Sequence, residues 1–73
     1  MVGTPKHRRL LGEAVRAKRK EAGFSQETLA EKADLSTVFI SRIERGVESP
    51  SVDNLARVAK ALGVRVRDLV EDF

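Results

Sequence analysis

SQETLAEKADLSTVFISRIERG, residues 25–46, contains two short helical patterns with almost no connection between them. Ser25 and Ser36 each precede one pattern and are suited to cap it, because a serine oxygen accepts a free backbone N–H of the first helical turn. The apolar positions that share one side are Leu29, Ala30 and Ala33 in the first pattern and Ile40 and Ile43 in the second. The stretch therefore predicts two amphipathic helices, each with its own start signal.

The connection between these two helices decides how they cross. The first helix is expected to end at Ala33 or Asp34 and the second to begin at Thr37, so the connection has about three residues, which is typical of a helix-turn-helix. The small side chains of Ala30 and Ala33 let the two backbones approach. We therefore predict a helix-turn-helix at residues 26–45.

The rest of the chain continues the helical pattern. Further helices are expected at residues 8–22 and 52–62, with a short one at 66–71, and the alternation typical of strands is absent. A chain of 73 residues of which 41% are hydrophobic is sufficient for one small domain. We predict an all-α fold, a compact five-helix bundle formed by residues 8–73 and preceded by a flexible basic tail, residues 1–7.

Composition excludes several classes of function. The chain has no cysteine and a single histidine, His7, so we expect no disulfide, no metal site and no cofactor. No apolar run is long enough to cross a membrane and the first residues are too polar for a signal peptide, so a cytoplasmic location is expected. No nucleophile–base pair or phosphate-binding loop is recognisable, and the chain is not expected to be an enzyme.

Basic residues are concentrated at the start of the chain. The net charge is +3, and residues 1–20 hold seven basic residues against Glu13 alone. Such a local excess can attract a polyanion, but it also fits an ordinary solvated helix face. For Lys6, Arg8 and Arg9 in particular, we expect either an arm that reaches such a partner or a solvated tail.

Specific motifs surround the predicted turn. Gln-x-x-Leu-Ala opens its first helix, Ile-Ser-x-Ile-Glu-x-Gly occupies its second, Pro-Ser precedes the next helix and Ala-Leu-Gly-Val ends it. With these motifs, residues 10–70 resemble the cro/repressor-like (XRE-type) family of helix-turn-helix regulators. The segments EKADL, FIS and IERG look most similar to the controller proteins of restriction–modification systems. The resemblance implies a lambda-repressor-like DNA-binding fold and double-stranded DNA as the partner.

Helix-turn-helix geometry and the resemblance together assign roles to the outward residues, because the second helix of the motif lies in the major groove. The residues expected to contact bases are Thr37, Val38, Ser41 and Arg42. The residues expected to contact phosphates are Gln26, Arg45, Ser49 and Ser51. Arg42 is the strongest reader, since arginine makes a bidentate contact to guanine. The alternative is a surface arginine paired with a neighbouring acid. In the loop after this helix, Glu48 occupies a position where a basic side chain would help DNA binding.

Two residues of the motif have structural roles. Helical spacing places Arg19 on the apolar face of the first helix, where a cation needs a partner. The resemblance implies that Arg19 forms a structural ion pair with Glu44. Asp34 occupies the turn position at which the family prefers glycine, and a left-handed backbone there costs an ordinary residue about 1–2 kcal/mol, although aspartate tolerates it better than most.

The end of the chain carries a second candidate surface. Val66, Val70 and Phe73 follow helical spacing and form an apolar stripe, while Leu69 is expected to dock on the core. A two-fold dimer would bury this stripe, and we predict a homodimer. The alternative is that Phe73 folds back onto the first or the fourth helix. The chain leaves no room for a ligand-binding domain, so no small-molecule ligand is expected.

These features favour a sequence-specific transcriptional regulator that acts as a homodimer on a palindromic operator, a restriction–modification controller being one such protein. The alternative is the DNA-binding antitoxin of a toxin–antitoxin pair. Co-purification with a small toxic protein would favour the antitoxin, and a footprint upstream of its own gene would favour the regulator.

Overall fold

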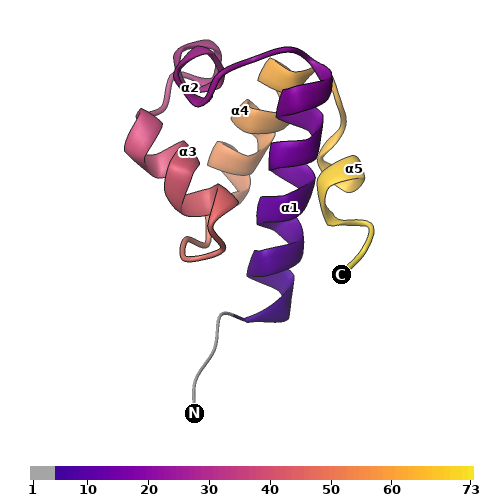
Figure 1. Cartoon of the computed structure of the whole chain (residues 1–73). Coiled ribbons are helices and arrows are strands. Elements are labelled where there is room, and N and C mark those ends of the chain that lie inside the picture. Colours follow the sequence, from indigo (N-terminus) through magenta and orange to yellow (C-terminus); the bar gives the residue numbers. More distant parts are fainter. Residues whose placement is uncertain (1–4) are drawn as a thin grey trace.

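Five helices account for most of the chain (Figure 1). The structure is a computed structural model that describes residues 5–73. The helices are α1 (Lys6–Glu21), α2 (Gln26–Ala33), α3 (Thr37–Glu44), α4 (Val52–Leu62) and α5 (Val66–Val70). No strand occurs within those residues, and the predicted all-α helix-turn-helix bundle is confirmed.

The longest helix, α1, organises the others. It packs against α3 on one side and against α5 on the other, while α2 packs against both α3 and α4 (Figure 1). The largest fully buried side chains come from four helices: Val15, Leu29, Ile40, Ile43 and Val58. Two of these five belong to α3, so one side of that short helix is held in the core and its opposite side is directed outward.

Glycine allows α1 and α3 to approach closely. A Cβ atom added to Gly12 would lie 2.5 Å from the backbone oxygen of Ile43 and 2.6 Å from that of Glu44. These separations are far shorter than a carbon–oxygen contact allows, and a helix backbone cannot rotate out of the way as a side chain can. Gly12, which the sequence analysis did not single out, therefore lets α1 pack directly on the last turn of α3.

Three helix boundaries differ from the sequence prediction, two in α1 and one in α5. α1 begins at Lys6 instead of Arg8, because the carbonyl of Pro5 accepts the backbone N–H groups of Arg8 at 3.0 Å and Arg9 at 3.1 Å. Lys6 and His7 are therefore helical and do not belong to a tail, and residues 1–4 of the predicted tail lie outside the described residues. α1 also ends one residue before the predicted residue 22.

The short helix α5 ends at Val70, one residue before the predicted end. Its start lacks a serine, threonine or asparagine cap, yet the Asp68 carboxylate accepts the backbone N–H of Arg65 at 2.9 Å. A carboxylate in the first turn of a helix also interacts favourably with the helix dipole. This contact fixes the start of α5. It could not be predicted from Arg65, the residue at the cap position, because the capping group belongs to Asp68.

The turn between α2 and α3 has the strained backbone that was expected at Asp34. Its φ of 57° and ψ of 46° lie in the left-handed region. The turn is closed by the backbone N–H of Leu35, which donates to the carbonyl of Ala30 at 2.9 Å. The side chain of Ser36 then starts α3 by accepting the N–H of Phe39 at 3.0 Å.

Replacing Asp34 with glycine should raise the free energy of unfolding by about 0.5–1 kcal/mol. Glycine removes the left-handed strain, and its greater freedom in the unfolded chain offsets only part of that gain. The exposed ion pair between Asp34 and Arg57, 4.0 Å apart, contributes little. Urea unfolding checks the value, with Asp34→Ala expected to be less stable than the natural chain. A glycine variant less stable than the natural chain would show that the carboxylate outweighs the strain.

Candidate nucleic-acid interface

The outward side of α3 presents most of the residues that were expected to contact bases. Thr37, Val38 and Arg42 are exposed, and Ser41 is half-buried at the edge of the same side. Phe39 is half-buried and packs against the core. The exposed side of α3 is thus polar and cationic apart from Val38. The major groove of B-DNA is wide enough to admit an α-helix.

A network of three side chains holds the end of α3. Arg19 on α1 donates from Nε to Oε2 of Glu44 at 2.7 Å and from Nη2 to Oε1 at 3.0 Å. Its remaining nitrogen, Nη1, donates to the carbonyl of Phe24 at 2.9 Å. Gln26, the first residue of α2, donates from Nε2 to Oε1 of the same Glu44 at 3.0 Å. The carboxylate of Glu44 therefore ties α1, α2 and α3 together at one point.

The two charges of this network are almost removed from water. The Arg19 side chain is 12% exposed and the Glu44 side chain 4%. The hydrogen bonds to Glu44 raise the pKa of Arg19 above its ordinary value, although burial opposes this shift. Because the pKa of Arg19 is raised, the stability that its charge contributes is present at neutral pH and is lost as the pH rises through that raised pKa. The pair is a structural clamp on α3.

Gln26 lies where a phosphate contact was predicted, but one of its amide hydrogens is already used. An amide NH₂ group has two hydrogens, so one remains available beside the backbone N–H groups of the first turn of α2. Gln26 is half-buried, and Glu44 fixes the direction of its amide. Gln26 and Glu44 both belong to the predicted motif, but the sequence pattern does not connect them.

Arg42 pairs with an acid, as the alternative reading of this residue proposed. Its Nε lies 3.2 Å from Oε1 of Glu48, in the loop after α3. The Arg42 side chain is 49% exposed and the Glu48 side chain 29%. Arg42 is therefore held at the outward surface by a neighbour and is still accessible from outside.

The other residues predicted to contact phosphates lie around the end of α3 and the start of α4. Arg45, the C-cap of α3, is exposed, and so is Ser49 in the following loop. Ser51 caps α4 by accepting the N–H of Asn54 at 3.1 Å, and its own hydroxyl hydrogen makes no hydrogen bond within residues 5–73. All three are exposed and belong to the segment that runs from the end of α3 to the start of α4.

The apolar stripe at the end of the chain is partly engaged within the chain. Val66 and Val70 are half-buried and pack against the core. Phe73 meets the ring of His7 edge-on, with 6.0 Å between the ring centres, and its side chain remains 57% exposed. The fold-back of Phe73 onto the first helix, left open by the sequence, is present, and an exposed apolar surface remains beside it.

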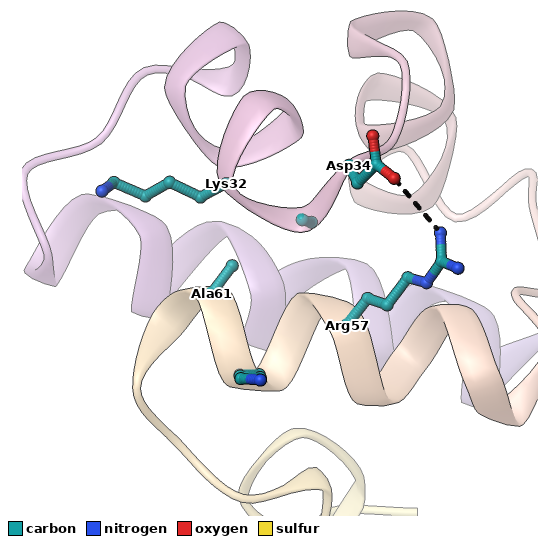
Figure 2. Close-up of a pocket in the computed structure, with 6 residues that line it drawn as sticks. Lys32, Asp34, Arg57 and Ala61 are labelled. Carbon is teal, nitrogen blue, oxygen red and sulfur yellow. Dashed lines mark ion pairs between the residues drawn. The ribbon is translucent and has the colours of Figure 1, made fainter.

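A separate groove lies between α2 and α4 (Figure 2). Its walls are formed by the residues Lys32, Ala33, Asp34, Arg57, Lys60 and Ala61. Asp34 and Arg57 approach each other across it (Figure 2). None of its residues is one that was predicted to contact DNA, so the groove is not part of the candidate interface.

No three His, Cys, Asp or Glu side chains among residues 5–73 gather closely enough to hold a metal ion. None of the helices described there is both long and apolar enough to cross a membrane.

The comparison with known proteins decides the family. The family model HTH_3, described as helix-turn-helix, matches residues 15–69. The chain belongs to this helix-turn-helix family. It is a DNA-binding transcriptional regulator of the XRE type, and the predicted resemblance is confirmed.

Individual relatives agree with this assignment. The control protein C.BamHI of Bacillus amyloliquefaciens is 45% identical over 65 residues, which cover 88% of this chain and 80% of that protein. The immunity repressor of Bacillus phage phi105 is 43% identical over 60 residues, covering 82% of this chain but 42% of the repressor. The helix-turn-helix domain therefore occurs both in proteins of this size and in longer ones.

Solved structures share the fold. The restriction–modification controller protein C.AhdI from Aeromonas hydrophila has a TM-score of 0.83 and 34% identity, and the match covers 85% of this chain and 94% of C.AhdI. The controller protein C.Esp1396I has a TM-score of 0.84 and 28% identity, and the match covers 93% and 90% of the two chains. The bundle is thus similar to controller proteins over almost their whole length.

Proposed function

We propose that the protein is a homodimeric regulator that binds a palindromic operator and controls a restriction–modification system. The similarity to C.BamHI and C.AhdI over most of their length supports the biological setting. The observation that carries the mechanism is the two-sided character of α3. Ile40 and Ile43 are buried, and the polar and cationic side is exposed.

In this proposal α3 enters the major groove. Arg42 contacts guanine O6 and N7, Ser41 and Thr37 meet neighbouring base edges, and Val38 contacts a thymine methyl group. The phosphates on either side of these bases are contacted by the residues Gln26, Arg45, Ser49 and Ser51. The backbone contacts fix the position of the domain, and the base contacts select the sequence.

The dimer follows from the limited reach of one recognition helix. A single helix reads a few base pairs, whereas two copies about 34–36 Å apart read a palindrome of one DNA turn. The exposed part of Phe73, together with the half-buried Val66 and Val70, supplies an apolar surface on α5 and the residues after it, which a second copy would cover. Phe73 remains 57% exposed although it contacts His7.

Selection of bound duplexes from random DNA, followed by sizing of the complex, tests the proposed function. We expect an enriched sequence with two-fold symmetry and a complex that contains two protein chains. Enrichment of a site without symmetry, bound by one chain, would contradict the dimeric mechanism. Failure to enrich any sequence would contradict sequence-specific regulation.

Replacing Arg42 with alanine should reduce discrimination at one base pair in each half-site by about 1–3 kcal/mol, because the bidentate contact to guanine is lost. Binding to random DNA should change little. Competition between the selected duplex and single-base variants measures this effect. Arg45→Ala is the matched control, since losing a phosphate contact should weaken binding to all sequences and reduce the salt slope by about one. Unchanged selectivity in Arg42→Ala would remove Arg42 from the base readers.

Replacing Val70 with glutamate should produce monomers, because a charge would be placed in the apolar surface that the dimer buries. Affinity for the palindrome should fall by about tenfold or more, since each monomer reads only half of the site. Sedimentation and circular dichroism check assembly and folding. The comparison variant Val38→Glu, on the exposed side of α3, should remain dimeric and lose DNA binding. A persistent Val70→Glu dimer would place the interface elsewhere.

A further inference from the structure

We propose that Glu48 sets the sequence specificity of the interface by positioning Arg42 and by weakening binding to DNA in general. This inference rests on the proposed function, because it concerns how α3 reads a base. Arg42 is the strongest predicted reader, and Glu48 is the acid that holds it.

The geometry of the pair leaves the recognition edge of the guanidinium unused. Glu48 accepts from Nε of Arg42 at 3.2 Å, and no hydrogen bond within residues 5–73 uses the two terminal nitrogens of Arg42. Those nitrogens carry four of the five N–H donors of the side chain and can bind the O6 and N7 atoms of guanine together. The pair thus restrains the arginine from one edge and leaves a bidentate edge for the base.

The loop that carries Glu48 is itself fixed to α3. Gly46 adopts a φ of 77°, which turns the chain back at the end of the helix. The N–H of Gly46 then donates to the carbonyl of Ile43 at 3.0 Å, and the N–H of Val47 donates to the carbonyl of Arg42 at 3.1 Å. Arg42 is therefore connected to this loop through both its backbone and its side chain.

Because the Arg42–Glu48 pair is exposed, we expect it to affect DNA binding more than the stability of the fold. Both side chains are accessible to solvent, and an ion pair of this kind adds little to the stability of the fold. When DNA approaches, however, the carboxylate repels phosphates and lowers the affinity for every sequence. A restrained Arg42 loses less side-chain freedom on binding, and this benefit is realised only where the guanine contact forms.

Two substitutions separate these effects. Glu48→Gln removes the charge but keeps an oxygen that can accept from Arg42, whereas Glu48→Ala removes both. Each should bind a random-sequence duplex roughly two- to fivefold more tightly, because a like charge has been removed. Only Glu48→Ala should also lose selectivity at the base pair read by Arg42, by roughly two- to tenfold. Binding is measured for the selected duplex, its single-base variants and random DNA.

Two controls tie the effect to this pair. In an Arg42→Ala background, Glu48→Ala should leave selectivity at that base pair unchanged, because nothing remains to be positioned. Glu31→Ala removes an exposed carboxylate on α2 that makes no ion pair within the described residues, and it should not alter selectivity. Circular dichroism establishes that all variants are folded.

The outcomes distinguish this inference from the proposed function. Suppose that the natural protein binds one duplex sequence more tightly than others while Glu48→Ala keeps full selectivity at every base pair. In that case Glu48 does not position Arg42. Higher selectivity in Glu48→Ala would identify Glu48 as a competitor of the base and overturn the inference in the same way. If the natural protein prefers no duplex, the proposed function fails first and the inference fails with it.

Discussion

Replacing Glu44 with alanine should lower the free energy of unfolding by about 3–5 kcal/mol, because it strands the nearly buried Arg19 without its partner. The amide of Gln26 would lose its acceptor as well. Small domains have unfolding free energies of the same order, so much of the variant protein should be unfolded at room temperature. Urea unfolding followed by circular dichroism measures the loss.

If Glu44→Ala does not fold, two further variants still test this prediction. Glu44→Gln retains oxygen and nitrogen atoms at the same place and should lose less stability. The double variant Arg19→Leu with Glu44→Leu removes both charges and should be more stable than Glu44→Ala, since the cost comes from leaving one charge unpaired. A cost below about 1 kcal/mol for Glu44→Ala would mean that water solvates Arg19 and that the clamp does not hold α3.

Replacing Gly12 with alanine should lower the free energy of unfolding by about 2–3 kcal/mol, even though alanine is the better helix former by about 1 kcal/mol. The new Cβ would meet two backbone oxygens of α3, those of Ile43 and Glu44, at 2.5 and 2.6 Å. Relief requires α1 and α3 to separate, which opens the core around Val15. Thermal unfolding should show a midpoint roughly 10–20 °C lower.

An exposed position on the same helix provides the comparison for Gly12. Ala17→Gly, on the exposed side of α1, should cost about 1 kcal/mol through helix propensity alone. The two exchanges run in opposite directions, yet both are expected to destabilise the protein. If Gly12→Ala were more stable than the natural chain, α1 and α3 would not be in the close contact described above.

Most of the fold could be predicted from sequence because its signals are local. Serines at three helix starts, apolar residues at helical spacing and the short connection around Asp34 each act within a few residues. The start of α1 was placed two residues late because Pro5, which supplies the first carbonyl of the helix, carries no side-chain cap. Gly12 was missed because its role depends on a neighbour that is distant in sequence.

The candidate site was predictable to the extent that helix geometry determines it. The exposed side of α3 follows from burying Ile40 and Ile43. The contact between Arg42 and Glu48, by contrast, depends on how the chain turns after Gly46, and helical spacing does not describe that loop. Glycine inside a helical pattern, and an acid shortly after a predicted reader, are the signals that could have pointed to these two contacts.

The central claim is that the bundle presents the outward side of α3 to the major groove. NMR titration of the isotope-labelled protein with the selected duplex tests it most directly, because each backbone amide reports on its own surroundings. We predict that the largest shifts occur at residues 36–45 and at Gln26. Amides at residues 36–45 that stay unmoved, while those around the groove between α2 and α4 respond, would contradict the account.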